Sequence, residues 1–264
     1  MKKNILFALI AMLSLLLAAC GTSEKNEGTN GDNNDGESTE KKVLEMATSA
    51  DFAPFESRNK DGEFIGFDID LANYIADELG YELNIQDMKF DGLIGALQND
   101  RVDMVLAGMS ATEKRQKNVD FSTTYNRSGE MFVTLKDAGI EKVEDLEGKT
   151  VGVQLGTIQQ EGAEKIQEDI VDFEMKTVDS GQVLIQELKS NRIDVAYMDK
   201  AVAKGYIKEQ DLFGFDDPTS SSPGMAVAFP KGSELVDEVN AILKEAEENG
   251  KLQELKDKWL EEEE

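Results

Sequence analysis

A pattern that occurs twice in the chain is the feature that most limits its possible folds. LIGALQNDRVDMVLAG at residues 93–108 aligns without a gap to LIQELKSNRIDVAYMD at residues 184–199, with identical Leu, Ile, Leu, Arg and Asp. Each copy predicts a short helix, a polar turn and a strand, although such units share some likeness in general. Because ligands of open α/β sheets bind beyond the carboxyl ends of strands, Gly108 and Asp199 are expected on opposite walls of one cleft.

From residue 43 onward, short β-like runs alternate with helical patterns, which indicates the α/β class and mainly parallel sheets. A helix is expected from about Asp70 to Leu79, with Asp70 as its N-cap and Gly80 after its last turn. Lys60-Asp61-Gly62 predicts the turn of a β-hairpin.

The apolar run at residues 225–229 suggests that the chain returns to its first domain. Crossings near residues 126–131 and 220–225 would then form a hinge of two strands. The predicted lobes are residues 43–127 plus 225–264 and residues 128–224.

The start of the chain has the pattern of an export signal. Residues 4–20 carry no charge and follow Met1-Lys2-Lys3. This stretch is shorter than the ~20 apolar residues that a spanning helix needs, and it ends in Leu17-Ala18-Ala19-Cys20-Gly21. That ending resembles the lipobox of bacterial lipoproteins. We expect a signal peptide at residues 1–19 and a lipid on Cys20, with an uncleaved anchor helix as the alternative.

Residues 22–42 contain no large apolar side chain, so they predict a flexible tether. Together with Cys20 this segment, residues 20–42, would hold a globular body near the membrane. The expected location is the extracytoplasmic face of the cell membrane, with the lipid as the sole membrane contact.

The composition excludes several classes of function. The chain has 54 Asp and Glu against 28 Lys and Arg, a formal charge of −26 that argues against a nucleic-acid partner. It has no His and one Cys among 264 residues, which excludes a Ser-His-Asp triad, a His-based zinc site and a CxxC pair. These absences exclude much enzyme chemistry, and we expect no metal and no cofactor.

Residues 107–115 predict a carboxylate site. The segment leaves a strand through Gly108-Met109-Ser110 and enters a helix at Thr112, which brings backbone donors, a hydroxyl and Arg115 together. Arg115 can donate a bidentate pair of hydrogen bonds to a carboxylate, and Ser110 can donate a third. The alternative is an arginine on a solvated helix face.

Four motifs occur in order and together resemble a known family: FAPFE at 52–56, GFDID at 66–70, DMVLAGMSATEKR at 103–115 and GKTVGV at 148–153. They resemble the polar amino-acid-binding proteins of ABC importers, over residues 43–259. TSAD at 48–51 and GVQLG at 152–156 are most similar to the arginine-binding lipoproteins of Gram-positive bacteria. The resemblance implies a type II periplasmic-binding-protein fold, a monomer and an ABC transporter permease as partner.

The resemblance also implies site residues. The carboxylate of a bound amino acid would meet Arg115, Ser110 and the backbone at Ile158, beside Thr157, and its ammonium group would meet Asp199 and the Gly108 carbonyl. The implied side-chain pocket consists of Ser49, Phe52, Phe90, Ala107 and Gln154.

Ser49 departs from several binders of basic residues, which carry Asp at that position, so Asp51 or Glu56 would have to supply the negative charge. Phe52 and Phe90 could hold a guanidinium between their rings.

The implied function is capture of a polar amino acid, arginine or another basic one, and its delivery to the permease. The alternatives are a glutamine- or cystine-specific binding protein of the same family, a sensor or dehydratase on the same fold, and a surface lipoprotein that binds protein partners.

Overall fold

The computed structural model describes residues 42–220 and 222–260, which fall within one compact unit. The predicted signal peptide, lipidated Cys20 and all of the predicted tether except Lys42 lie outside the described residues. Among the described residues, no helix combines the length and the apolar character needed to cross a membrane.

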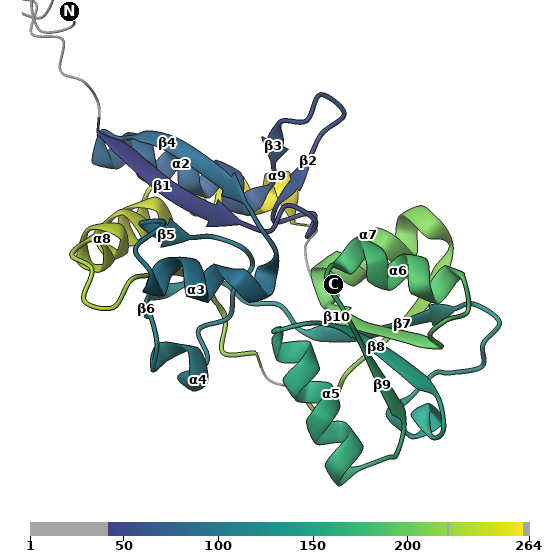
Figure 1. Cartoon of the computed structure of the whole chain (residues 1–264). Coiled ribbons are helices and arrows are strands. Elements are labelled where there is room, and N and C mark those ends of the chain that lie inside the picture. The colour runs from purple at the N-terminus through teal and green to yellow at the C-terminus, as the bar shows by residue number, and fades with distance from the viewer. Residues whose placement is uncertain (1–41, 221, 261–264) are drawn as a thin grey trace, which may run out of the picture. The chain divides into compact units, whose positions relative to one another are not determined.

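The first lobe is built on a five-stranded sheet in the order β4-β1-β5-β12-β6 (Figure 1). Its strands are β1 (Val43–Thr48), β4 (Glu82–Asp87), β5 (Met104–Val105), β6 (Asp120–Asn126) and β12 (Met225–Phe229). The helices of this lobe are α2 (Phe67–Leu79), α3 (Leu93–Gln98), α4 (Glu113–Gln116), α8 (Leu235–Glu248) and α9 (Lys251–Trp259), with the 3₁₀ turn η1 (Phe90–Gly92).

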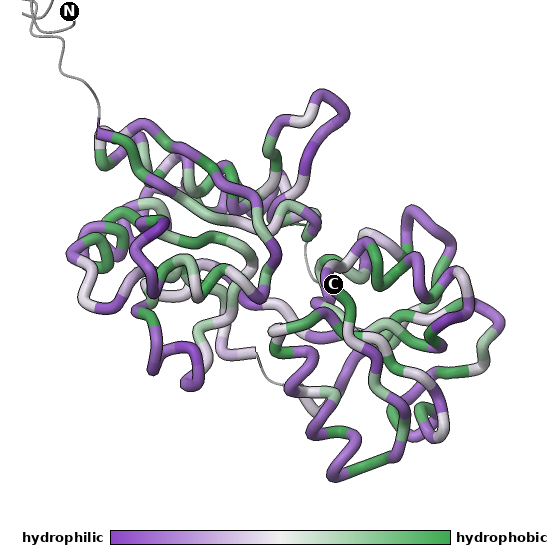
Figure 2. Tube along the Cα trace, viewed as in Figure 1, coloured by the Kyte–Doolittle hydropathy of each residue, from purple (hydrophilic) through white to green (hydrophobic). Residues whose placement is uncertain are grey.

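A small hairpin extends from the first lobe. β2 (Ser57–Arg58) pairs with β3 (Phe64–Ile65) in antiparallel register, so the predicted hairpin is confirmed. The tip of this hairpin is hydrophilic (Figure 2), as a solvated turn requires.

The second lobe is built on another five-stranded sheet, in the order β11-β7-β10-β8-β9. Its strands are β7 (Glu130–Leu135), β8 (Thr150–Gln154), β9 (Glu174–Val178), β10 (Val195–Asp199) and β11 (Leu212–Asp216). Its helices are α5 (Ile158–Asp169), α6 (Gly181–Lys189) and α7 (Lys200–Gln210), with the 3₁₀ turn η2 (Val143–Leu146).

The two-lobed α/β fold is confirmed, but the sheets are mixed rather than mainly parallel. In the first sheet β1 runs parallel to β4 and β5, whereas β12 runs antiparallel to β5 and β6. In the second sheet β8 runs parallel to β9 and β10, whereas β7 runs antiparallel to β10 and β11. The antiparallel strands β6, β7, β11 and β12 flank the two passages of the chain between the sheets. The residue bounds of the lobes stay a prediction.

Helix α2 corrects a second expectation. It begins at Phe67 after Gly66, and it ends at Gly80, whose left-handed φ of 73° closes the last turn. The Asp70 amide donates to the Gly66 carbonyl at 3.0 Å, so Asp70 lies inside the first turn and is not the N-cap. Its carboxylate instead accepts from Trp259 Nε1 at 2.7 Å, which joins α2 to α9.

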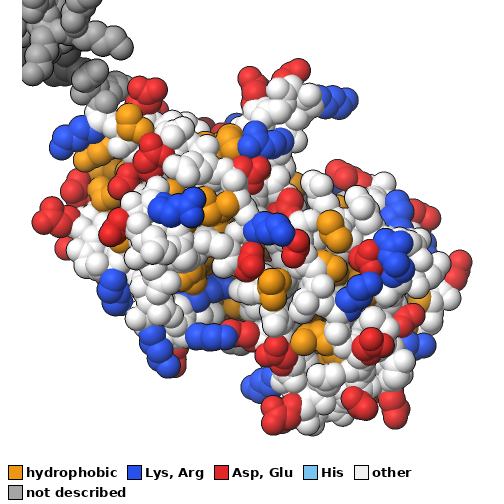
Figure 3. Space-filling model, in the orientation of Figure 1, with side chains coloured by type: hydrophobic (Ala, Val, Ile, Leu, Met, Phe, Trp, Pro, Cys, Tyr) orange, Lys and Arg blue, Asp and Glu red, His pale blue; other side chains and the backbone are white. Residues whose placement is uncertain are grey.

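Charged side chains of both signs are interspersed over the face of the molecule seen in Figure 3. The buried side chains are mainly apolar, and the fully buried ones include Phe55, Phe67 and Leu71 in the first lobe and Phe132 in the second. Each sheet therefore has an apolar interior, which fixes the positions of its strand ends.

Candidate functional site

One cavity is lined by residues from both lobes. It brings together all thirteen residues that the sequence analysis assigned to a ligand, and Gln159 and Met225 also line it. The lining residues are Ser49, Asp51, Phe52, Glu56, Phe90, Ala107, Gly108, Ser110, Arg115, Met225, Gln154, Thr157, Ile158, Gln159 and Asp199.

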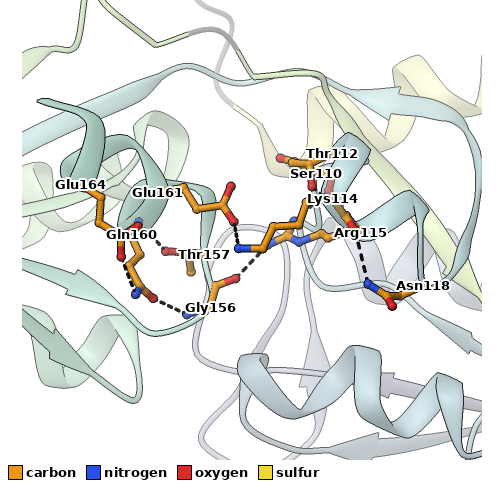
Figure 4. Close-up of polar contacts among 10 residues, drawn as sticks. All are labelled: Ser110, Thr112, Lys114, Arg115, Asn118, Gly156, Thr157, Gln160, Glu161 and Glu164. Atoms are coloured by element: carbon orange, nitrogen blue, oxygen red, sulfur yellow. Dashed lines mark hydrogen bonds and ion pairs between the residues drawn. The ribbon is translucent and has the colours of Figure 1, made fainter. Parts of the chain in front are cut away.

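Arg115 is held at the wall contributed by the first lobe. Helix α4 has only four residues, and its N-cap Thr112 accepts from the Arg115 amide at 3.2 Å. The guanidinium donates through Nη1 to the Ser110 carbonyl at 2.8 Å and through Nη2 to the Gly156 carbonyl at 3.0 Å (Figure 4). The second of these bonds crosses from one lobe to the other.

The environment of Arg115 suits an anion. Its side chain is buried, and burial lowers its pKa to about 10, so it stays positively charged at neutral pH. Within the described part of the chain no carboxylate forms an ion pair with it. Its guanidinium carbon lies 5.3 Å from the centre of the Phe90 ring, so Phe90 faces this arginine at the cavity wall.

The start of α5 provides the facing wall in the second lobe. Thr157 is the N-cap of this helix: its hydroxyl accepts from the Gln160 amide and donates to the Gln154 carbonyl at 2.7 Å. Ile158 is the first helical residue, where backbone N–H groups lack partners within the helix. Donors at the N-terminus of this twelve-residue helix therefore face the cavity that Arg115 lines.

Asp199 ends strand β10 and caps helix α7. Its Oδ1 accepts from the Ala201 amide at 2.8 Å, the Val202 amide at 3.4 Å and the Ser128 hydroxyl at 3.0 Å. The side chain is buried, so these bonds hold a carboxylate at one fixed place in the cavity wall.

Gly108 follows strand β5 (Met104–Val105), at the position of the first copy of the repeat that aligns with Asp199. Its φ is +54°, and a Cβ there would lie 2.7 Å from Cε1 of Phe52. Only glycine allows the Phe52 ring to approach this closely. Phe52 in turn stacks on Phe55, with ring centres 5.7 Å apart.

Asp51 links the two lobes at another edge of the cavity. Its Oδ1 accepts from the Ser49 hydroxyl and its Oδ2 accepts from the Gly181 amide, each at 3.1 Å. Burial is the main cause that raises the pKa of Asp51, and the bonds from Ser49 and Gly181 oppose that shift. Ser49 therefore positions a carboxylate, a role that its sequence position alone did not reveal.

Glu56 is the most unusual acid in the cavity wall. It is fully buried, and neither of its carboxylate oxygens has a hydrogen-bond partner among the described residues. Burial raises its pKa well above the ordinary value, and the nearby charge of Asp68 adds to this shift. Such a group needs either a proton or a cation beside it.

Asp68 lies behind Glu56 and supports the loop at Gly108. Its Oδ2 accepts from the Gly108 amide at 2.7 Å and from the Tyr125 hydroxyl at 2.8 Å. Burial raises the pKa of Asp68 to about 6, and these two donors limit the rise. Asp68 is therefore a positioning residue that the GFDID motif did not identify as such.

The second lobe also contains a buried acid close to the cavity. Glu130 accepts a hydrogen bond from Nε2 of Gln159, and its Oε1 has no partner within residues 42–220 and 222–260. Burial, followed by the charge of Asp199, raises its pKa to about 9. Glu130 therefore holds a proton at neutral pH, which removes its negative charge from the neighbourhood of Asp199.

Gln159 and Met225 were missed by the sequence analysis for different reasons. Gln159 is the second residue of α5, one position beyond the predicted Ile158, and the helix start was a signal that could have included it. Met225 starts β12, more than a hundred residues after Ser110, which forms a bridge with it. No local pattern announces a contact at that separation.

Among the described residues, no group of His, Cys, Asp and Glu side chains has the arrangement of a metal site. The cavity is instead lined by one arginine, three acids and two aromatic rings. These groups can bind an organic ion through paired charges and stacking.

Comparison with known proteins identifies the family. The model for bacterial extracellular solute-binding proteins, family 3, matches residues 44–262. The arginine-binding extracellular protein ArtP of Bacillus subtilis (strain 168) is 44% identical over 98% of this chain and 98% of its own.

Two solved structures extend the comparison. An ancestral arginine-binding protein bound to arginine is 39% identical, with a TM-score of 0.78 over 82% of this chain and 97% of its own. The ancestral amino acid-binding protein AncCDT-1, a precursor of cyclohexadienyl dehydratase, is 34% identical, with a TM-score of 0.78 over 83% of this chain and 96% of its own. The resemblance inferred from the four motifs is thus confirmed, and the chain belongs to the bacterial extracellular solute-binding proteins of family 3.

Proposed function

We propose that the chain binds arginine in the cavity between its lobes and delivers it to the permease of an ABC transporter. The observation that carries this proposal is a buried arginine and a buried acid at the cavity wall, neither of which has an ion-pair partner among the described residues. Arg115 has no carboxylate partner and Glu56 has no donor among the described residues. An amino acid with a cationic side chain would supply both missing partners.

The carboxylate of the solute would lie between Arg115 and the start of α5. The guanidinium offers a planar fork for two carboxylate oxygens, and the N–H groups at Ile158 add donors from the other lobe. Contacts from both lobes favour the closed arrangement, because a closed cavity gains more binding free energy than an open one.

The ammonium group of the solute would lie at Asp199 and the Gly108 carbonyl. The two residues occupy aligned positions at the ends of the two copies of the repeat, one in each lobe, and both line the cavity. With Glu130 protonated, Asp199 carries the negative charge that pairs the ammonium group.

The side chain of the solute would extend toward Glu56 and Asp51, past Phe52 and Phe90, with Ser49, Ala107 and Gln154 completing the pocket. A guanidinium beside Glu56 would replace the proton that this carboxyl otherwise holds. The similarity to ArtP, at 44% identity, supports arginine as the solute.

We further propose that the protein performs no chemistry on its solute, acts as a monomer and is held at the membrane by a lipid on Cys20 after removal of residues 1–19. The relatedness to AncCDT-1 makes the dehydratase the alternative to exclude. Incubation with prephenate and arogenate should give no product.

The direct test is calorimetric titration of the full-length protein in detergent with arginine, lysine, histidine, glutamine and cystine. Arg115→Ala should weaken arginine binding by ~2–5 kcal/mol because the solute carboxylate is left buried and unpaired. Arg101→Ala is the matched control and should leave binding unchanged. It removes an exposed arginine that is identical in the two copies of the repeat.

Glu56→Gln tests the choice of side chain. Arginine binding should fall at least about tenfold, or ~1.4 kcal/mol, because the neutral amide cannot pair a guanidinium. Binding of glutamine should change far less. Preferential binding of glutamine or cystine by the unaltered protein would refute the arginine proposal while keeping the amino-acid site.

A further inference from the structure

Three acidic side chains meet at one end of the second sheet. Glu130 is the first residue of β7, Asp199 is the last residue of β10, and Asp217 follows the last residue of β11. Glu130 and Asp199 are paired in the antiparallel register of β7 and β10, so their side chains project from the same face of the sheet. Side chains at such positions are neighbours, with Cβ atoms about 4.5–5.5 Å apart. Two carboxyl groups therefore share one site beside the solute cavity.

Two of these three acids are surrounded by hydrogen-bond donors. Asp199 accepts through Oδ1 from backbone amides of α7 and from the Ser128 hydroxyl. Asp217 accepts through Oδ1 from the amide and the hydroxyl of Thr219, at 2.8 and 2.7 Å. Its Oδ2 accepts from the Tyr197 hydroxyl. Donors of this kind favour the charged form of a carboxyl group.

Glu130 has different surroundings. Its side chain is 3% exposed, Oε2 accepts from Nε2 of Gln159, and Oε1 has no hydrogen-bond partner in the described part of the chain. Lys200 lies beside Gly129, but it forms its ion pair with Asp216, at 3.0 Å. Glu130 is therefore the member of the group that is best placed to hold a proton, in agreement with its raised pKa.

The neighbours of Glu130 on β10 and α5 leave this assignment unchanged. Burial is the main cause that raises the pKa of Tyr197, and its hydrogen bond to Asp217 adds to the shift, so the phenol stays neutral. Helix α5 presents Gln159, which does not titrate.

We propose that Glu130 is a positioning residue for the ammonium group of the solute: with Asp199 it forms an acid pair that holds one proton and releases it when the ammonium group binds. The O–H bond of the Glu130 carboxyl breaks, its electron pair stays on the carboxylate, and the proton passes to the solvent. This inference rests on the proposed function in one respect, the placement of the ammonium group at Asp199.

The direction of the effect follows from charge. A positive charge beside a carboxyl group favours the ionised form, so the bound ammonium group weakens proton binding at Glu130. Without solute the pKa of Glu130 is about 9, so its proton is present at pH 8 and is partly lost in the complex. Binding that releases a proton becomes stronger as the pH rises. Solute affinity should therefore rise between pH 7 and pH 8.5.

The test is calorimetric titration of the full-length protein in detergent with arginine at pH 8, in phosphate, HEPES and Tris buffers. These buffers differ in ionisation enthalpy, so the dependence of the heat on the buffer gives the number of protons released. If the ammonium group weakens proton binding at Glu130 tenfold, the unaltered protein should release about 0.4 more proton per solute than Glu130→Gln. At pH 6.5 the two proteins should release the same number, because Glu130 then keeps its proton with and without solute.

Glu130→Gln has the shape of the protonated acid and keeps an acceptor for Gln159, so its fold should stay intact. The difference between the two proteins also cancels protons that the solute or Glu56 exchanges. From pH 7 to pH 8.5, the affinity of the unaltered protein should rise about threefold relative to the variant. A purely structural role of Glu130 would change the affinity by the same factor at both pH values.

Two further variants complete the test. Glu168→Gln makes the same change of charge at an exposed position of α5, and it should release as many protons as the unaltered protein. Gln159→Leu keeps Glu130 but removes the donor to its carboxylate, so the release that depends on Glu130 at pH 8 should fall by roughly half.

The outcomes separate this inference from the proposed function. Equal proton release by the unaltered protein and Glu130→Gln, while arginine binds, would overturn the acid pair and leave the proposed solute unchanged. An equal loss of release in Glu168→Gln would overturn it too. If glutamine or cystine binds in place of arginine, it tests the pair in the same way, because it carries the same ammonium group. Failure of every amino acid to bind would overturn the proposed function and the acid pair together.

Discussion

The two copies of the helix–turn–strand repeat agree in their supporting residues and differ in their last one. Asp103 and Asp194 play the same part. Each accepts through Oδ2 from a backbone amide of the neighbouring parallel strand, Glu45 of β1 in one lobe and Thr150 of β8 in the other, at 2.8 Å. Asp100 and Asn191 adopt left-handed φ angles of 50° and 53° in the same turn.

The last residues of the two copies differ in chemistry. The first copy ends in Gly108, which supplies a close backbone approach, and the second ends in Asp199, which supplies a carboxylate. The comparison teaches that one scaffold positions two unlike groups at facing walls of the cavity. It also separates the residues that hold the scaffold from the residue that we propose pairs with the solute.

Asp199→Asn should have the largest effect on function, because it removes the charge that distinguishes the last residue of the second copy from Gly108. Asparagine is also a good N-cap, so α7 should keep its cap, but the ammonium group of the solute would lose its charged partner. Binding should weaken by ~2–5 kcal/mol in calorimetric titration. The melting temperature should change little, and Asp216→Asn, at an exposed position, is the control.

Glu130→Gln should change how the free energy of unfolding depends on pH, because Glu130 is a buried acid of the second lobe. Because the pKa of Glu130 is raised to about 9, its contribution to stability is present below its ordinary pKa and is lost as the pH rises toward 9. The variant should gain about 1 kcal/mol over the unaltered protein for each pH unit in this range. Denaturant unfolding at several pH values measures the gain, and Glu168→Gln on the surface of α5 should show none.

Asp103→Ala and Asp194→Ala test whether the two copies stabilise their strands equally, because each removes the equivalent hydrogen bond. Each variant loses one hydrogen bond to a strand amide and should lose about 1 kcal/mol of unfolding free energy. Asp103 is half-buried and Asp194 is exposed, so the loss should be larger in the first lobe. A larger loss at Asp194 would show that the two copies do not support their strands in the same way.

Asp100→Gly and Asn191→Gly should give the smallest effects. Both residues have positive φ, which glycine adopts without a steric penalty, so each change should be neutral or stabilise the fold by less than about 1 kcal/mol. Asn191→Ala should instead destabilise it. Thermal unfolding of the three variants is the measurement, and a gain from alanine would contradict the assigned backbone conformation.

Much of the fold followed from local patterns in the sequence. The repeat gave both helix–turn–strand units, and Gly80 gave the end of α2, because these signals depend on neighbouring residues. The direction of the strands beside the passages between lobes depends on long-range pairing, which no local pattern encodes. The start of α2 was missed because Gly66 and Phe67 begin the helix without a side-chain cap.

The cavity followed from the sequence to an unusual degree because the family motifs mark its residues. The sequence did not show what each side chain contacts. That Glu56 lacks a hydrogen-bond partner, or that Asp68 supports Gly108, depends on packing between α2, β5 and β6. Met225 lines the cavity because the chain returns to the first sheet at β12, a contact that no local sequence pattern indicates.

That return also sets an order of assembly. Strand β12 lies between β5 and β6, so the first sheet has a gap until residues 225–229 have been synthesised. The second sheet is complete by Asp216 and needs no later strand. During synthesis, the lobe that begins second can therefore finish first, and a chain cut short before residue 225 has no intact first sheet from which to present Arg115.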